Sequence, residues 1–245
     1  MKKYIEYIEN CERIISRIKN EEASNIERAA ELFKKSVVNG RPVFLFGTGH
    51  SHMLAEELFY RAGGLADIQP ILETSLMLHE SASKSTEIER LEGYAEIIFS
   101  HYGIKSGDVM VIISNSGRNG VIVDMALLCR ERGVTVIALT NTEHAKAGAS
   151  RHKSGKRLFE IADVVLDNCG CNGDASVNVD GVDGKICPTS TVAGALILNA
   201  VVAECVDLCA KEGVVPVHFA SSNVDGGDEI NHAVIELKRG EVRHL

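Results

Sequence analysis

The stretch from residue 109 to 128 constrains the fold of this chain more than any other. Val109 to Ile113 is a continuous apolar run rich in β-branched residues, which is typical of a strand buried on both faces of a parallel sheet. From Val121 onward, apolar residues recur at helical spacing. The stretch therefore predicts a strand, a short polar loop and the beginning of a helix, in that order.

The loop between this strand and helix has the composition of an anion-binding turn, Ser114-Asn115-Ser116-Gly117-Arg118-Asn119-Gly120. The first turn of a helix has backbone N–H groups without intrahelical partners and carries the positive end of the helix dipole. Serine and asparagine add side-chain donors, and Gly117 permits the close approach of a ligand. The loop therefore predicts phosphate binding, although an ordinary αβ turn also favours Ser, Asn and Gly.

A second loop of this kind follows an earlier strand, predicted over residues 42–46. It is Gly47-Thr48-Gly49-His50-Ser51-His52, and a helix to about residue 61 follows. The dinucleotide-binding fingerprint requires a third glycine where this chain has His52, so we expect no nicotinamide site. Two small-residue loops at the carboxyl ends of parallel strands instead predict one ligand site where the loops diverge.

Three further segments are candidates for the site. Residues 73–90 are polar and longer than a usual connection, which favours a binding or lid role, with a solvated loop as the alternative. Residues 143–157 are a basic excursion, either a flap over an anionic sugar or a solvated loop. A long apolar helix after Pro188 begins with Thr189, Ser190 and Thr191, a third hydroxyl-rich candidate for anion binding.

The remaining segments concern architecture rather than chemistry. Residues 2–19 and 21–38 predict two amphipathic helices, which could dock on the sheet or on a partner subunit. Residues 67–72, 134–139 and 162–166 predict three more strands. The glycine- and aspartate-rich segment 168–188 lacks the spacing of a calcium loop or a zinc knuckle. Residues 221–232 are turn-prone and too polar for a core.

Composition excludes several classes of partner. The chain has 26 Lys and Arg against 34 Asp and Glu, a net charge of −8, so we expect no nucleic-acid binding. The longest apolar run is shorter than a membrane span, and the N-terminus has no signal-peptide pattern, so we expect no membrane association. Seven scattered cysteines are typical of free thiols in a reducing cytoplasm.

Together the three loops resemble the SIS domain, the sugar isomerase fold of phosphosugar isomerases and binding proteins. The similarity covers roughly residues 30 to 212 and is most specific in the Ile113-to-Gly117 segment. It is closest to a branch of single-SIS-domain proteins often named as phosphosugar or phosphoheptose isomerases. The resemblance implies a three-layer αβα, flavodoxin-like fold with a five-stranded parallel sheet. It also implies a homodimer or tetramer with sites at subunit interfaces.

The resemblance also implies roles for individual residues. The SIS domain would span residues 41–212, between N-terminal helices at 1–40 and a C-terminal extension at 213–245. Asn119 stands where many relatives have Thr or Ser. The implied substrate-binding residues are Gly49, Ser51, Ser114, Asn115, Ser116, Gly117 and Asn119, with Thr189, Ser190 and Thr191 nearby.

The catalytic pattern of the characterised relatives does not transfer. Phosphoheptose isomerases have a zinc-binding His and Glu on the helix after the first loop, and the matching positions here are Glu57 and Arg61. A cationic Arg61 cannot ligate a metal, so we expect neither a metal nor another cofactor. Etherases acting on muramic acid phosphate have a catalytic Glu near the same place, and Arg61 breaks that match as well.

Three functions follow from these observations. The first is an aldose–ketose isomerase acting on a sugar phosphate, which needs a general base. The second is a non-catalytic sugar-phosphate-sensing regulatory protein, and the third is an amino-sugar-phosphate lyase or etherase. The sequence does not define the sugar. Our candidate bases are Glu80, Glu87, His50 and His52, with His79 or a neighbouring subunit's copy of His218 or His232 also open.

Overall fold

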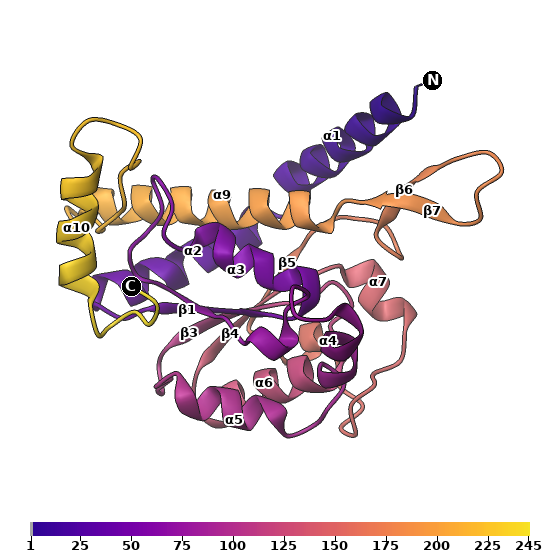
Figure 1. Ribbon diagram of the computed structural model, residues 1–245, viewed down its shortest axis with the longest axis horizontal. Coiled ribbons are helices and arrows are strands. Elements are labelled where there is room, and N and C mark those ends of the chain that lie inside the picture. Colours follow the sequence, from indigo (N-terminus) through magenta and orange to yellow (C-terminus); the bar gives the residue numbers. More distant parts are fainter. Residues whose placement is uncertain (1) are drawn as a thin grey trace.

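The computed structural model describes residues 2–245 and contains the predicted five-stranded parallel sheet (Figure 1). The strand order is β2-β1-β3-β4-β5, and all four neighbouring pairs are parallel. The expected strands and the three-layer αβα fold are confirmed. The strands are β1 (Val43–Gly47), β2 (Ile68–Ile71), β3 (Val109–Ile113), β4 (Thr135–Thr140) and β5 (Val164–Asp167).

Successive side chains of β3 point to opposite faces of the sheet, and all of them are apolar, so the sheet needs helices on both faces. Val109, Val111 and Ile113 pack in one core cluster, and Met110 and Ile112 pack in another. Every residue of β3 is buried, as the continuous apolar run predicts. The first cluster is covered by α1 (Lys3–Glu21), α2 (Ala23–Val38), α3 (Met53–Leu58) and α9 (Ser190–Lys211), and the second by α5 (Tyr94–His101), α6 (Gly120–Glu131) and α8 (Leu158–Ile161).

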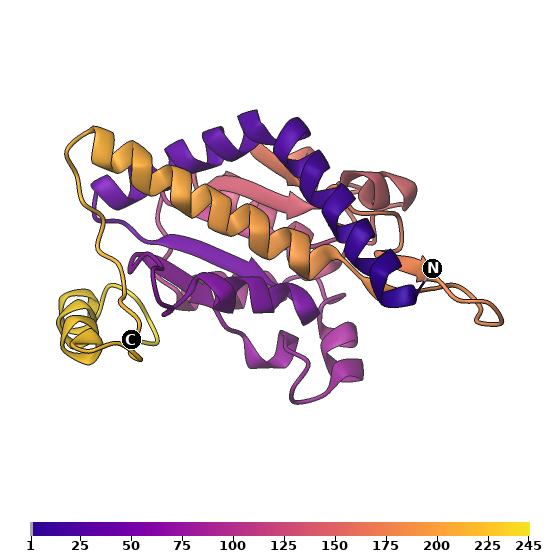
Figure 2. The same cartoon turned by 90° about the horizontal axis from the view of Figure 1, so that it is seen from above.

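Helix α9 lies alongside α2 over one face of the sheet (Figure 2). A Cβ atom on Gly194 would lie only 2.5 Å from Leu54, so glycine is what allows α3 to approach α9 closely. By length and composition α9 could cross a membrane, and 44% of its most apolar window is buried within this fold. Core helices of soluble proteins pass the same test, so this helix is weak evidence for a membrane span.

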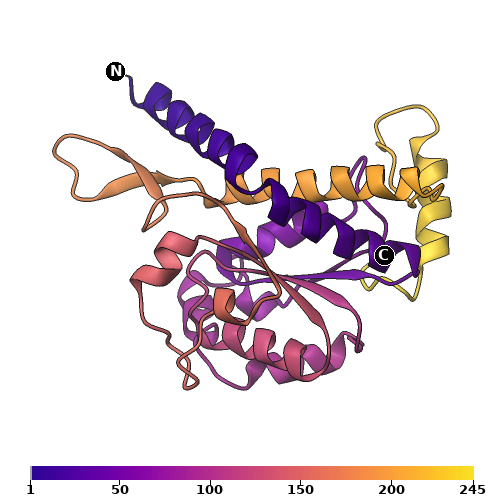
Figure 3. The same ribbon diagram turned by 180° about the vertical axis from the view of Figure 1, so that it is seen from behind.

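Helix α1 and an antiparallel hairpin project together beyond the sheet (Figure 3). The hairpin consists of β6 (Ala175–Asn178) and β7 (Lys185–Pro188), within the glycine- and aspartate-rich segment 168–188, where we named no strand from the sequence. Two hydrogen bonds join it to α1: Asn10 Nδ2 donates to the Ser176 carbonyl at 2.9 Å, and the Tyr7 hydroxyl donates to the Pro188 carbonyl at 2.9 Å.

The C-terminal tail corrects another expectation. We expected residues 221–232 to be irregular, but helix α10 (Gly227–Lys238) begins within them. The buried Asn231 side chain holds this helix by bonding both the N–H and the carbonyl of Ala220. Val234 adds a small apolar contact with Phe219. The division of the chain at residues 40 and 212 stays a prediction.

Candidate functional site

Strands β1 and β3 are neighbours in the sheet, but the connections that follow them run toward opposite edges of the sheet. The chain runs from β1 to β2 on one side and from β3 to β4 on the other. Neighbouring loops diverge at such a switch point, where open parallel sheets bind ligands. The single-turn helix η1 (Gly49–His52) and the loop from Ser114 to Asn119 both lie here. The two loops that we predicted to form one site therefore meet.

A small polar cavity lies beside these loops on the α9 side of the sheet. Its volume is about 30 Å³, room for little more than one water, so a sugar would lie above it. Its apolar wall is Leu54, Ile113 and Leu139, which belong to the core cluster under α9. Its polar lining is His50, Ser51, Asn115, Asn168, Ser190 and Thr191, five of which we predicted as site residues.

The hydrogen bonds within the loops determine which side-chain donors remain available to a ligand. Asn168 Nδ2 donates to Asn115 Oδ1 at 2.8 Å, which leaves the Asn115 amide nitrogen as a donor. Ser114 Oγ accepts from the Gly117 N–H at 3.0 Å and closes the turn, so its own proton is still available. Within residues 2–245, no hydrogen bond to protein engages the side-chain hydroxyls of three other predicted residues, Ser51, Ser116 and Thr191.

A carboxylate from the hairpin segment occupies the beginning of α9. Asp174 Oδ1 accepts from the N–H groups of Thr189 and Ser190 at 3.0 and 2.8 Å. Asp174 Oδ2 accepts from Ser190 Oγ at 2.6 Å. Thr189 and Ser190 thus serve an internal anion, and Thr191 keeps a free hydroxyl at the cavity.

Glu89 joins the two loops on the other side of the sheet, at the end of α4 (Ala82–Ile88). Its Oε2 accepts from Thr48 Oγ1 at 3.0 Å, and its Oε1 accepts from Asn119 Nδ2 at 2.7 Å. Its backbone carbonyl accepts from the Val121 N–H at 3.1 Å. Burial raises the pKa of the Glu89 carboxyl above its ordinary value, against the opposing effect of the Thr48 hydrogen bond.

The four predicted catalytic residues differ in position. Glu80 and Glu87 are exposed, and the hydrogen bond from Lys84 lowers the pKa of Glu80, which makes it a weaker base. His50 lines the cavity. His52 is buried, and its Nδ1 lies against the carbonyl of Gly49 within the same turn. The structure thus brings only His50 of these four to the cavity, and their catalytic roles stay predictions.

Glu57 and Arg61, at the zinc-site positions of phosphoheptose isomerases, form an ion pair with each other. Asn199 of α9 also donates to Glu57 at 3.1 Å. Across residues 2–245, no group of three or more His, Cys, Asp or Glu side chains is arranged to hold a metal ion.

The basic segment after β4 begins with helix α7 (Thr142–Ala147) and is anchored near the loops. His152 is buried, with its Nε2 2.8 Å from Asp124 Oδ1 on α6 and its Nδ1 2.8 Å from Ser154 Oγ. Arg151 Nη1 donates to Asn119 Oδ1 at 3.1 Å. The segment therefore reaches Asn119 beside the candidate site, and its role as a flap or as a solvated loop stays a prediction.

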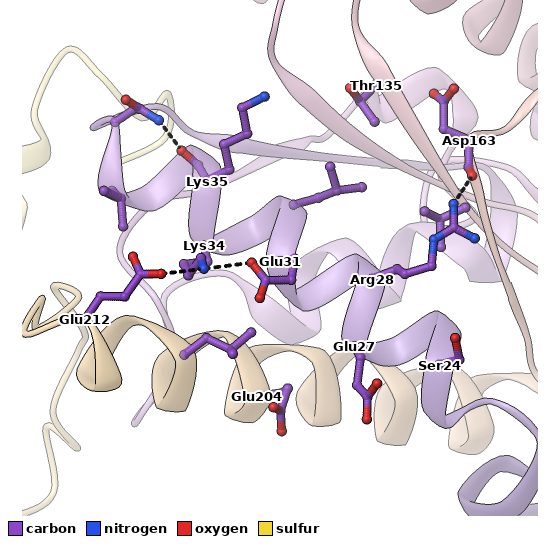
Figure 4. Close-up of a pocket in the computed structure, with 15 residues that line it drawn as sticks. Ser24, Glu27, Arg28, Glu31, Lys34, Lys35, Thr135, Asp163, Glu204 and Glu212 are labelled. Atoms are coloured by element: carbon purple, nitrogen blue, oxygen red, sulfur yellow. Dashed lines mark hydrogen bonds and ion pairs between the residues drawn. The ribbon is translucent and has the colours of Figure 1, made fainter.

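A larger hollow, about 990 Å³, lies at the opposite edge of the sheet (Figure 4). It is formed by α2, α9 and the amino ends of β4 and β5. Its central cation, Lys34, is paired with Glu31 at 2.7 Å and Glu212 at 2.8 Å. Parallel sheets bind ligands at the carboxyl ends of their strands, so we do not place the site here.

The parallel-sheet fold and the two ligand loops are those of a SIS-domain protein, and a comparison with family models supports this assignment. The SIS domain model matches residues 6–141, and the chain belongs to this family. A UPF0309 protein of Caldanaerobacter subterraneus subsp. tengcongensis is 45% identical, with 98% of both chains covered. A UPF0309 protein of Geobacillus thermodenitrificans is 44% identical over 94% of this chain and 93% of its own.

Solved structures are more distantly similar. A phosphoheptose isomerase from Neisseria gonorrhoeae matches with a TM-score of 0.49 and 19% identity, covering 83% of this chain and 95% of that one.

Proposed function

We propose that this protein binds a phosphorylated sugar and interconverts its aldose and ketose forms. The observation that carries the proposal is the position of Glu89, whose half-buried carboxylate bonds to both ligand loops. Free hydroxyl and amide donors occupy the same pair of loops. A phosphate anchor and a candidate base thus lie at one edge of one sheet.

The phosphate anchor is the set of donors that the protein leaves unused, namely Ser51, Ser114, Asn115, Ser116 and Thr191. A hydrogen bond to a charged group contributes roughly 1.5–3 kcal/mol, and a helix N-terminus adds roughly 0.3–1 kcal/mol. Three such bonds with the dipole of α6 approach the ~8 kcal/mol of a micromolar complex. Asn119, which we also predicted as a phosphate ligand, uses both ends of its amide on Glu89 and Arg151.

Glu89 is the base that we propose for the proton transfer. Aldose–ketose isomerisation moves a proton between adjacent carbons through an enediolate, and it needs a base whose pKa is near the working pH. Burial raises the pKa of Glu89 toward that range. We propose that His50, which lines the cavity, donates to the developing oxyanion. We therefore prefer Glu89 to Glu80 and Glu87.

A second copy of this chain is the partner that we propose. Tyr4 and Ile8 on α1 and Ile186 on the adjoining hairpin expose 61, 50 and 42% of their surface. An apolar projection of this kind is typical of a subunit interface. A homodimer or tetramer would also close the shallow cavity from above.

We propose that the protein works in the cytoplasm, where its seven free cysteines stay reduced.

Calorimetric titration with five- to seven-carbon sugar phosphates tests the anchor. We expect Ser114→Ala combined with Ser116→Ala to weaken binding at least tenfold. Ser100→Ala, an exposed hydroxyl on α5 away from the loops, is the matched control and should bind as the native protein does. Native affinity in the double variant would refute phosphate binding at this loop.

A further inference from the structure

Three arginines from three segments surround the beginning of α6. They are Arg90 after α4, Arg118 in the ligand loop and Arg151 in the basic segment, and we refer to them as the arginine trio. The Arg151 N–H donates to the Arg118 carbonyl at 2.9 Å. A Cβ on Gly120 would lie 2.6 Å from the Arg90 carbonyl, so the Arg90 backbone packs against the first turn of α6.

The arginine trio has no carboxylate partner within residues 2–245. No guanidinium group of the trio lies within 4.0 Å of an Asp or Glu oxygen there, whereas Arg157 pairs with Glu160 at 2.8 Å. Glu89, the acidic neighbour, directs its two oxygens to Thr48 and Asn119. Partial desolvation and the like charges of the other two arginines lower the pKa of Arg151.

Unpaired like charges at the positive end of a helix are unfavourable unless an anion joins them. Such a cluster is unexpected in a chain of net charge −8. Guanidinium groups bind carboxylates and phosphates in bidentate geometry, which lysines do not. The trio thus has the chemistry of an anion site that the protein itself does not fill.

This site is distinct from the phosphate anchor. The cavity with Asn115 adjoins the core cluster under α9. Gly117, by contrast, adjoins Leu158 of the cluster under α6, and Asn119 after it contacts Glu89 and Arg151. The loop therefore separates the two groups of donors, and a single phosphate does not satisfy both.

We propose that the arginine trio binds a second anionic group of the substrate, so that the substrate class is a sugar phosphate with an additional carboxylate or phosphate. This inference rests on the proposed sugar-phosphate function and refines its substrate class. The phosphate would lie on the hydroxyl side of the loop, and the second acidic group on the α6 side, beyond Glu89.

Two matched pairs of ligands test the proposal by calorimetry. Fructose 1,6-bisphosphate against fructose 6-phosphate tests a second phosphate, and glucuronic acid 1-phosphate against glucose 1-phosphate tests a carboxylate. We expect the member with two acidic groups in at least one pair to bind at least tenfold more tightly to the native protein. In Arg118→Gln combined with Arg151→Gln, that ratio should fall below twofold.

Arg132→Gln, at the far end of α6, is the control and should keep the native ratio. Circular dichroism of each variant checks that it is folded. Binding of the monophosphates with no preference in either pair would overturn this inference alone. A ratio that survives in the double variant would also overturn it, while binding of none of the four ligands would overturn the proposed function as well.

Discussion

Glu89 and Asn119 are hydrogen-bonded beside the two ligand loops, with Asn119 Nδ2 2.7 Å from Glu89 Oε1. The bond links the segment after α4 to the loop after β3, two parts of the chain that are 30 residues apart. Thr48 donates to the other carboxylate oxygen from the loop after β1. One carboxylate thus holds both loops in place while its own pKa is raised by burial.

This raised pKa makes stability depend on pH in a definite direction. A carboxyl whose pKa rises on folding binds its proton more tightly in the native state, so its contribution is stabilising below the unfolded pKa and is lost as pH rises through the native pKa. At pH 7 the half-buried Glu89 charge therefore lowers the free energy of unfolding. We expect Glu89→Gln to be more stable than the native protein at pH 7, with the difference disappearing toward pH 4.

Urea unfolding of the native protein and the variant at pH 4, 5.5 and 7 measures this difference. Glu87→Gln, an exposed glutamate two residues earlier in the last turn of α4, is the control and should show no such trend. A Glu89→Gln variant that is less stable by the same amount at every pH would show that its hydrogen bonds, and not its charge, dominate.

Asp174 caps the long helix α9 through two backbone N–H groups and one hydroxyl. Loss of a helix cap costs about 1 kcal/mol. We expect Asp174→Ala to lower the free energy of unfolding by about that much in urea titrations, and Asp174→Asn, which keeps an acceptor oxygen, to lower it less. Asp180→Asn at the exposed hairpin tip should have no effect. Equal losses for the alanine and asparagine variants would contradict the capping role.

The buried ion pair between Lys238 and Asp67 attaches α10 to the segment that leads into β2. Lys238 Nζ lies 2.5 Å from Asp67 Oδ1, and both side chains are at least nine-tenths buried. Removing one partner leaves the other charge buried without a counter-ion, which lowers the free energy of unfolding by about 3–5 kcal/mol. We expect Lys238→Met to lose stability of that order in urea unfolding, and Asp67→Asn combined with Lys238→Met to recover most of it. A double variant as unstable as the single one would refute the charge argument.

The sequence predicted the sheet and both loops because their information is local. Val109 to Ile113 shows its burial as an unbroken apolar run, and small residues follow directly. It did not identify Glu89, because Glu80, Glu87 and Glu89 all lie in one polar stretch. Which of them faces the site depends on where α4 ends and on Gly120, which lets the following backbone approach α6.

Helix α10 and the hairpin were missed for a related reason. Both depend on distant contacts that no local pattern encodes, such as the Asn231 side chain on Ala220 and Asn10 on Ser176. Glycine and aspartate have low propensity for regular structure, so tertiary contacts outweigh local preference there.

The most direct test of the central claim is deuterium exchange into five- to seven-carbon sugar phosphates in heavy water, followed by NMR. We expect the native protein to incorporate deuterium at the carbon next to the carbonyl of at least one of them. Glu89→Gln should bind the same sugar phosphate but exchange 10²- to 10⁴-fold more slowly, the usual contribution of a general base. Exchange at the native rate in Glu89→Gln would contradict its role as the base. Binding to the native protein without any exchange would instead indicate a non-catalytic sensor of sugar phosphates.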